Sequence, residues 1–270
     1  MKSDIYKINN SEEGVKVSVS AETMELLLLA KEIYENSDGA FNIAIYPLTK
    51  LWKFDSANFN YSVKEAPNDE KIEELLQYCS FTKDNFILDK ENLTVTKKHK
   101  ECALDLGAMV KGYNLDIARK VAEKYGISNS LYSFGGSSIL GYGKSYNLGL
   151  IDANNKERIL GALLLPQNYC ISTSGVYERF YKDSAGNSYH HILDKSGKPA
   201  NSKVVGVTVV GKSGVVCDMI STAVVVLGAE KGRELMQKYD LYGIIILEGN
   251  KFTTVGRVGF SLELTDYERV

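Results

Sequence analysis

Asp218 and Thr222 are the two side chains whose types and spacing point most directly to chemistry. They belong to the segment Asp218-Met219-Ile220-Ser221-Thr222, and in a helix positions i and i+4 lie on one face. A carboxylate and a hydroxyl are hard oxygen donors of the kind that Mg²⁺ takes, and this ion completes its shell with water and substrate phosphate. The plainer interpretation is an aspartate that caps the helix beside a threonine bonded back to the chain. The pair alone leaves both interpretations open.

A second segment, Asp105–Tyr113, could bind an anion. It reads DLGAMVKGY and places an acid, two glycines and a lysine at the start of a predicted helix. Backbone amides at a helix start favour anions, and Lys111 would add a point charge suited to phosphate. An ordinary helix start with a solvated lysine is the alternative.

The chain has three histidines, and His190 and His191 are adjacent. Neighbouring residues of a strand point to opposite faces, so only one of the two can face a given site. A histidine near a phosphate-binding acid and hydroxyl is a candidate general base. A purely structural histidine is the alternative.

Composition narrows the class of protein. The 270 residues are 44% hydrophobic and 24% charged, with a net charge of −2, whereas nucleic-acid binders usually carry a basic excess. No apolar run approaches the roughly 18 residues of a membrane span. The four cysteines lack zinc-type spacing, and we expect them to be small buried hydrophobic residues: Cys79, Cys102, Cys170 and Cys217.

Two common catalytic motifs are incomplete in this sequence. Gly143-Lys144-Ser145 resembles the end of a phosphate-binding P-loop, but Ser138 stands where that loop needs its first glycine. No GxSxG elbow of the α/β-hydrolases occurs around Ser137 or Ser174. These two classes of enzyme are therefore disfavoured.

The elements that must position these residues mix helices and strands without a regular βαβ rhythm, which predicts an α+β or mixed α/β fold. In the first half we expect a strand at 15–19, a helix from the cap Ser20 to about residue 35, and a loop at 55–68. A short helix capped by Asn68 and two short strands within 86–97 follow. A longer helix over 108–125 is expected to end at Gly126 and to face inward with Val110, Ile117 and Val121.

The second half is richer in strands. Strands are expected near 129–134, 146–151, 159–165, 168–172, 188–193 and 203–210. A helix from Asp218 to Leu227, broken at Gly228, would precede another over 229–239. The last strands would be 243–247 and 251–254. We expect residues 1–270 to form one domain.

Taken together and in this order, the segments resemble the Mg²⁺-dependent FAD:protein FMN transferase (flavin transferase, ApbE) family. Asp105–Tyr113 is similar to its DLGxxxKGY segment, and Asp218–Thr222 to its DxxST segment. The remaining similarities are Gly39-Ala40-Phe41-Asn42 with Pro47-Leu48 and Leu51-Trp52, Gly135-Gly136, Thr173-Ser174-Gly175 with Tyr177-Glu178-Arg179, and His191-Ile192 with Asp194, Gly197 and Pro199.

The resemblance implies a compact domain of mixed sheets with flanking helices. It also implies a reaction: FAD is cleaved at its pyrophosphate, FMN passes to a Thr or Ser hydroxyl of a target flavoprotein, and AMP leaves. Some members hydrolyse FAD to FMN and AMP, so an FAD pyrophosphatase is one alternative and a non-catalytic flavin-binding module is another. Members are commonly exported lipoproteins, which favours an extracytoplasmic location, although cytosolic members are known.

The same resemblance assigns roles to residues. Mg²⁺ would be held by the Ala108 carbonyl, Asp218 and Thr222. His191 would help to deprotonate the attacking hydroxyl, so His191 and Asp218 are the expected catalytic residues. The expected FAD contacts are Asn9, Phe41, Asn42, Asp105, Lys111 and His191.

This sequence departs from the family pattern in several places. Phe41-Asn42-Ile43-Ala44 stands where many members have FDPT or FDIT, and Gly135-Gly136-Ser137 replaces Gly-Gly-Asp. The usual HIxDPxTG is shortened and lacks its proline. Members reach the segment equivalent to Asp4–Asn9 only after an opening strand and helix that carry a methionine-containing loop near the flavin. We therefore expect this opening to be absent and FAD affinity to be low.

Overall fold

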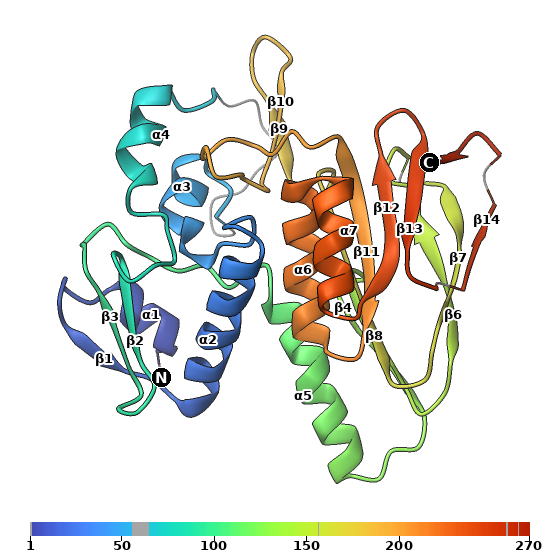
Figure 1. The fold of residues 1–270 in the computed structure, drawn as a ribbon, viewed down its shortest axis with the longest axis horizontal. Helices are drawn as coiled ribbons and strands as arrows, with labels where there is room; N and C mark the ends of the chain where they lie inside the picture. The colour runs from blue at the N-terminus through green and yellow to red at the C-terminus, as the bar shows by residue number, and fades with distance from the viewer. Residues whose placement is uncertain (1, 56–64, 156, 258, 264) are drawn as a thin grey trace. The chain divides into compact units, whose positions relative to one another are not determined.

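The computed structural model describes residues 2–55, 65–155, 157–257, 259–263 and 265–270 (Figure 1). They form two compact units. The first contains residues up to Leu106 together with Arg179–Ala200, and the second contains Gly107–Glu178 and Asn201–Val270. Helices together with several sheets, whose described pairings are antiparallel except for one parallel pair in the largest sheet, confirm the predicted α+β class. Most of the loop predicted at 55–68 lies outside the described residues.

The first unit begins with two helices and a small sheet. Helix α1 (Asp4–Asn9), strand β1 (Lys16–Ser18) and helix α2 (Ala21–Asn36) precede β2 (Phe86–Asp89) and β3 (Thr94–Lys97), and the sheet order is β1-β3-β2. Ser20 caps α2 as predicted, because its side chain accepts the Thr23 amide proton. One helix face is buried at intervals of three residues: Met24, Leu27, Ala30 and Ile33.

The rest of the first unit surrounds an aromatic core. It consists of η1 (Ile43–Ile45), α3 (Tyr46–Leu51), α4 (Asp69–Leu76) and the hairpin of β9 (Phe180–Lys182) with β10 (Ser188–His190). The core cluster contains Leu48, Trp52, Phe54, Ile72, Cys79, Tyr181 and Leu193. The Trp52 indole donates a 2.8 Å hydrogen bond to the Gly197 carbonyl. This bond ties the returning segment, far away in sequence, to α3.

A seven-stranded sheet forms the centre of the second unit, in the order β15-β13-β12-β11-β8-β5-β4. Its strands, in chain order, are β4 (Ser130–Phe134), β5 (Ser138–Tyr142), β8 (Tyr169–Gly175), β11 (Val204–Gly211), β12 (Tyr242–Leu247), β13 (Lys251–Val255) and β15 (Glu268–Arg269). Helices α5 (Val110–Lys124), α6 (Gly214–Leu227) and α7 (Ala229–Lys238) pack against this sheet.

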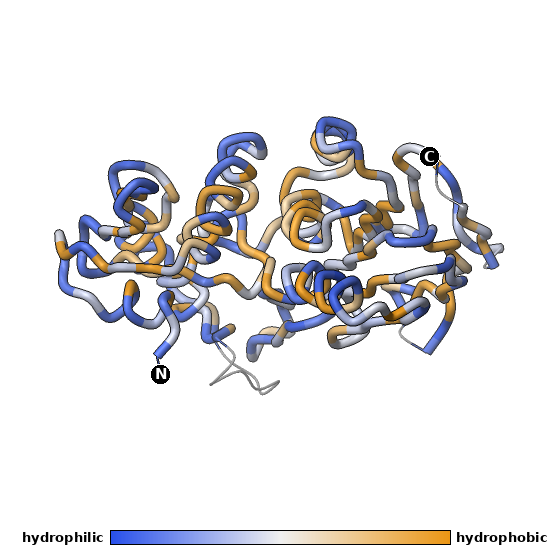
Figure 2. Tube along the Cα trace, turned by 90° about the horizontal axis from the view of Figure 1, so that it is seen from below, coloured by the Kyte–Doolittle hydropathy of each residue, from blue (hydrophilic) through white to orange (hydrophobic). Residues whose placement is uncertain are grey.

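A three-stranded sheet, in the order β14-β7-β6, completes the second unit. It contains β6 (Tyr146–Ile151), β7 (Ile159–Leu165) and β14 (Phe260–Leu262). Buried leucines of this sheet pack with Ile171 of β8 and Ile244 of β12 in one hydrophobic cluster. Alternation along β8 therefore turns Ile171 toward the small sheet and leaves Ser172 and Ser174 on the side of the helices. Hydrophobic stretches run through the interior, and hydrophilic stretches gather at turns and outer helix faces (Figure 2).

Helix α5 differs from its prediction in the face that it buries. Val110 and Val121 are each 44% exposed, whereas Gly112, Leu115 and Ala122 are buried. The prediction was therefore wrong for Val110 and Val121, whereas Ile117 is half-buried. The buried face is set by the contact with α6, which requires a residue without a side chain at Gly112. The stop at Gly126 is confirmed by its φ of +64°.

Helix α6 begins at Gly214, four residues before the predicted start. Ser213 is its cap and accepts the Val216 amide proton. The Asp116 carboxylate accepts the amide protons of Gly214 and Val215 at 2.8 and 3.0 Å. Asp218 is therefore one turn inside the helix, and the capping interpretation of this residue is wrong. A distant carboxylate fixes this start, which local sequence does not reveal.

Several short elements were not predicted: α1, η1, α3, β5, β9, β14 and β15. The segment expected as a strand over 188–193 forms a strand only over Ser188–His190, and Leu193 makes an isolated antiparallel bridge with Pro199. All four cysteines are free and buried, as predicted. Among the described helices, none combines the length and the hydrophobicity needed to cross a bilayer.

The Asp4 carboxylate should stabilise the first unit in a pH-dependent way. It accepts hydrogen bonds from the Ser20 amide at 2.8 Å, the Lys7 ammonium at 2.9 Å and the Thr23 hydroxyl at 3.0 Å. These bonds, led by that of the Ser20 amide, lower the pKa of Asp4 from 3.8 to about 2. Because the folded-state pKa is depressed, the stabilisation is complete above pH 3.8 and is lost as the pH falls toward 2.

We expect Asp4→Asn to lower the free energy of unfolding by roughly 1 kcal/mol at pH 6. The difference from the native chain should shrink between pH 4 and pH 3. Urea unfolding at the three pH values measures it, with Glu25→Gln on the exposed side of α2 as the control. A difference that is the same at every pH would show that the Asp4 charge is not responsible.

Candidate functional site

Asp218 is a buried carboxylate at the contact of two helices. It lies on α6, is 4% exposed, and one carboxylate oxygen accepts the Gly112 amide proton of α5 at 2.8 Å. That amide belongs to the first turn of α5, whose amide protons have no partner inside the helix. The carboxylate therefore satisfies a donor of the helix start and is held in a fixed orientation.

Two glycines make this contact possible. A Cβ atom on Gly112 would lie 2.1 Å from the Gly214 carbonyl oxygen and 2.7 Å from the Asp218 Cβ. A Cβ atom on Gly214 would lie 2.4 Å from the Gly112 carbonyl oxygen. All three distances are far shorter than van der Waals contact. The helices therefore approach backbone to backbone, and the aspartate bridges them.

Burial raises the pKa of Asp218 above its usual value of 3.8. The Gly112 amide, the positive charge of Lys111 and the Ser138 hydroxyl oppose this shift by favouring the charged form. Burial is the largest of these effects. A cation placed against the carboxylate would offset the cost of burying its charge.

Lys111 points to the turn between β4 and β5. Its ammonium donates a short hydrogen bond to the Ser137 hydroxyl. Gly135 and Gly136 form this turn with φ values of +66° and +75°, and added Cβ atoms there would meet nothing within 4 Å. The backbone of the turn is therefore open to a group that approaches the lysine.

Hydroxyl groups surround Asp218 on the helix side of the sheet. Ser221 and Thr222 of α6 both lie within hydrogen-bond distance of the Ser174 hydroxyl of β8, at 2.7 and 3.2 Å. Thr222 also lies 3.4 Å from the Asp218 carbonyl oxygen, as expected for a threonine bonded back along its helix. The threonine therefore has the back-bonded position of the plainer interpretation, with the Ser174 hydroxyl as a second and nearer acceptor, and the lone pairs of its oxygen stay available in either case.

These donors fit a hard divalent cation. Asp218 supplies a carboxylate, Thr222 a hydroxyl, and Ala108, a half-buried residue two positions before the start of α5, a backbone carbonyl. Within the described ranges, no three His, Cys, Asp or Glu side chains gather as a ready-made metal site. Mg²⁺ does not require such a group, because it commonly binds one or two carboxylates and keeps several waters. The donor chemistry is therefore suited to Mg²⁺ rather than to zinc.

Part of the predicted FAD-contact set lies together in the first unit. The side-chain amide of Asn9 accepts the Leu104 backbone amide proton at 2.8 Å and donates to the Leu104 carbonyl at 2.9 Å. The next residue, Asp105, donates its amide proton to the Ile43 carbonyl at 2.7 Å. These bonds fix the backbone that carries Asp105.

Phe41 and Asn42 have structural roles in the same unit. Phe41 is 1% exposed and belongs to the hydrophobic core. The Asn42 side chain accepts the Ala44 amide proton and so caps η1. It also donates a hydrogen bond to the Cys79 carbonyl, which links η1 to the chain that follows α4. Their predicted contact with FAD stays a prediction.

The two adjacent histidines have different surroundings. His190 Nε2 lies 3.0 Å from the Ala200 carbonyl oxygen, which can only accept, so this nitrogen carries the proton. Its Nδ1 is buried without a hydrogen-bond partner in the described part of the chain. Burial lowers the pKa of His190, against the opposing effect of the Ala200 carbonyl. His190 is therefore a neutral, structural residue.

His191 follows the end of β10. Its Nδ1 lies 3.2 Å from the Arg179 carbonyl, and its ring packs edge-on against Phe54 with centroids 6.4 Å apart. Since the carbonyl only accepts, Nδ1 donates, and a neutral ring then has its lone pair on Nε2. This tautomer is the one that a general base acting through Nε2 requires.

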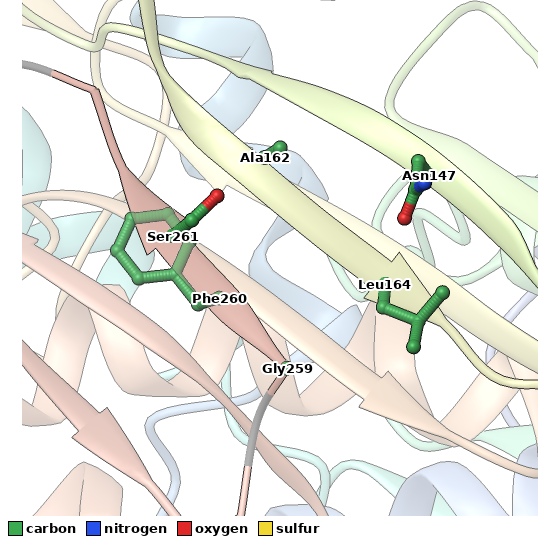
Figure 3. A pocket seen from close by; sticks show the side chains of 6 residues that line it. All are labelled: Asn147, Ala162, Leu164, Gly259, Phe260 and Ser261. Carbon is green, nitrogen blue, oxygen red and sulfur yellow. The ribbon is translucent and has the colours of Figure 1, made fainter.

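A shallow hollow of about 330 Å³ lies on the three-stranded sheet of the second unit (Figure 3). Its lining consists of Asn147, Ala162, Leu164, Gly259, Phe260 and Ser261. None of these side chains is an acid, a base or a strong nucleophile. The hollow therefore offers no chemistry comparable with that around Asp218.

The structure thus groups Ala108, Lys111, Asp218 and Thr222 in the second unit, and Asn9, Phe41, Asn42, Asp105 and His191 in the first. Sequence reasoning missed three groups beside Asp218: the Gly112 amide, the Ser138 hydroxyl and the Ser174 hydroxyl. Ser138 and Ser174 lie on strands β5 and β8, at positions whose side chains face the helices. Polar residues at inward positions of two strands were the available signal.

Comparisons with known proteins agree on one family. The sequence matches the model of the ApbE family over residues 1–245. It is 30% identical over 249 residues to an FAD:protein FMN transferase of Klebsiella pneumoniae (strain 342), covering 90% of this chain and 75% of the relative. The crystal structure of the ApbE protein from Thermotoga maritima superimposes with a TM-score of 0.79 at 28% identity, covering 95% of this chain and 81% of that one.

The flavin transferase ApbE from Vibrio cholerae has the same fold. Its TM-score is also 0.79, at 23% identity, with 94% of this chain and 81% of that chain covered.

The close approach of α5 and α6 can be tested by enlarging Gly112. An exposed helical Gly→Ala change normally stabilises a protein by up to about 1 kcal/mol. Here the added methyl group would meet the Gly214 backbone, so we expect Gly112→Ala to destabilise by about 2–3 kcal/mol. Urea unfolding measures the change, with Lys120→Ala on the exposed face of α5 as the control. Stabilisation by Gly112→Ala would contradict the backbone contact.

Proposed function

This chain belongs to the ApbE family, and from that premise we propose that it transfers FMN from FAD to a Thr or Ser hydroxyl of a target flavoprotein, with Mg²⁺ and release of AMP. The names of several relatives, from different bacteria, support flavin transfer. The observation that carries the finer proposal is the buried Asp218 carboxylate, oriented by the Gly112 amide beside the charge of Lys111.

Each candidate site residue of the second unit has a role in this function. Asp218, the Thr222 hydroxyl and the Ala108 carbonyl would hold Mg²⁺. When bound, this ion would neutralise charge on the diphosphate as the phosphoryl group transfers. Lys111, presented by the first turn of α5 toward the open Gly135-Gly136 turn, would place its positive charge against a phosphate oxygen.

In the first unit, Asn9 and Asp105 would contact FAD through the backbone that Asn9 fixes. His191 would accept the proton of the acceptor hydroxyl at Nε2, while Nδ1 keeps its bond to the Arg179 carbonyl. The hydroxyl oxygen would then bond to the phosphorus of the FMN half, and the bond from that phosphorus to the AMP half would break. AMP would leave with the electron pair of the broken bond.

The proposal is tested by incubating the chain with FAD and Mg²⁺, with and without a bacterial protein extract as the source of acceptors. Covalent FMN appears as flavin fluorescence on a denaturing gel, and AMP is measured by chromatography. We expect a fluorescent band that needs the chain, FAD and Mg²⁺, together with AMP. AMP without a fluorescent band would indicate an FAD pyrophosphatase, and neither product would indicate a flavin-binding module. The exported location stays a prediction.

Removing the charge of Asp218 should remove catalysis without loss of the fold. Asp218→Asn keeps the shape of the side chain and an acceptor for the Gly112 amide, but it cannot neutralise a cation. We expect FAD cleavage to fall nearly to background while the circular dichroism spectrum is retained. Cleavage by this variant at the native rate, with the native dependence on Mg²⁺, would show that Asp218 is not the principal metal ligand.

The two histidines provide a matched pair. General-base help is typically worth about 10²–10⁴-fold in rate, so His191→Ala should lose activity on that scale. His190→Ala should lose far less, because its ring is buried and bonded to the Ala200 carbonyl. Initial rates of AMP release under saturating FAD compare them. Equal losses would mean that the assignment of the base to His191 is wrong.

A further inference from the structure

We propose that Ser174 is a positioning residue for the metal ligand Thr222. Its hydroxyl accepts the proton of the Thr222 hydroxyl and so directs the lone pairs of the Thr222 oxygen toward the cation. The inference rests on the proposed function, because it concerns the same metal site.

Ser174 reaches Thr222 because of strand alternation. On β8, Ile171 and Thr173 face the small sheet, and Thr173 pairs there with the Thr208 hydroxyl of β11 at 3.0 Å. Ser172 and Ser174 face the other way, toward α6. Ser172 lies 3.3 Å from the Ser138 hydroxyl of β5. The sheet therefore presents a line of serine hydroxyls to the helix that carries Asp218.

The direction of each hydrogen bond follows from counting donors. The Ser221 hydroxyl lies 2.9 Å from the Asp218 carbonyl oxygen, which can only accept, so Ser221 donates to it. A hydroxyl has one proton, so Ser221 can only accept from the Ser174 hydroxyl 2.7 Å away. Ser174 therefore donates its own proton to Ser221.

Thr222 completes the chain of donors. Having given its proton to Ser221, Ser174 can only accept from the Thr222 hydroxyl 3.2 Å away. The other acceptor near Thr222 is the Asp218 carbonyl oxygen, which has a second lone pair but lies farther away, at 3.4 Å, so we assign the Thr222 proton to the shorter bond with Ser174. The protons thus run in one direction, from Thr222 to Ser174 to Ser221 to the Asp218 carbonyl.

This order matters for metal binding. A hydroxyl that binds a cation must turn its proton away and offer an oxygen lone pair. The Ser174 hydroxyl, on the side of the sheet, accepts the hydrogen bond from the Thr222 hydroxyl. Without it, the Thr222 proton would be held only by the longer contact with the Asp218 carbonyl and would be freer to rotate toward the cation. Metal affinity should therefore fall, as it does by about 10–100-fold when groups that orient metal ligands are removed elsewhere.

Four variants separate this role from a general contribution to stability. Ser174→Ala removes the hydroxyl, and Ser174→Thr restores it with a methyl group that a strand tolerates. Thr173→Val is the matched control, because it removes a hydroxyl of the same strand that points to the opposite face. Asp218→Asn removes the proposed principal ligand.

Binding of Mn²⁺ without FAD is measured by electron paramagnetic resonance of the free ion. Melting temperatures in EDTA record stability apart from the metal. We expect Ser174→Ala to weaken Mn²⁺ binding about 10-fold or more. We expect Ser174→Thr to recover most of the affinity and Thr173→Val to bind like the native chain.

Native affinity in Ser174→Ala would overturn the role of Ser174 and leave the metal site intact. Equal losses in Ser174→Ala and Thr173→Val would also overturn it, since stability alone would then explain the effect. Failure of the native chain to bind Mn²⁺, or undiminished binding by Asp218→Asn, would overturn the metal site itself and with it this part of the proposed function.

Discussion

The contact of α5 with α6 through two glycines is the constraint on which the second unit depends. Gly112 and Gly214 bring the two backbones together, and that distance allows the Asp218 carboxylate to accept a proton from the start of α5. The same first turn carries Lys111, and Ala108 lies two residues before its start. This one helix contact therefore fixes the Asp218 carboxylate, the Lys111 ammonium group and the Ala108 carbonyl relative to one another.

Burial gives this arrangement its chemical character. A carboxylate that is 4% exposed is costly to charge, and its raised pKa records that cost. The Gly112 amide and the Ser138 hydroxyl replace part of the lost water at the carboxylate, and the hydroxyls of Ser174, Ser221 and Thr222 continue this polar layer. A polar layer of this kind between helix and sheet contributes less to stability than an apolar one of equal volume. In the proposed function, this polar layer orients the ligands of a cation.

Much of the fold could be predicted from local sequence. The Ser20 and Asn68 caps and the glycine stop at Gly126 depend on neighbouring residues, and the structure confirms them. The start of α6 could not be predicted, because Asp116 fixes it from 98 residues away. The buried face of α5 was predicted wrongly for a similar reason, since only the partner helix requires a glycine there. The site residues could be predicted from the order of the sequence motifs and their resemblance to one family. Their orientation could not, because it depends on contacts between residues that are distant in sequence.

The central claim is that a cation is held between α5 and α6 by Asp218 and Thr222. Anomalous diffraction from crystals grown with Mn²⁺ tests it most directly, because the scattering locates the ion without reference to activity. The account predicts an anomalous peak bonded to a carboxylate oxygen of Asp218 and to the hydroxyl oxygen of Thr222. A fully occupied peak elsewhere in the molecule, with none beside Asp218, would contradict it.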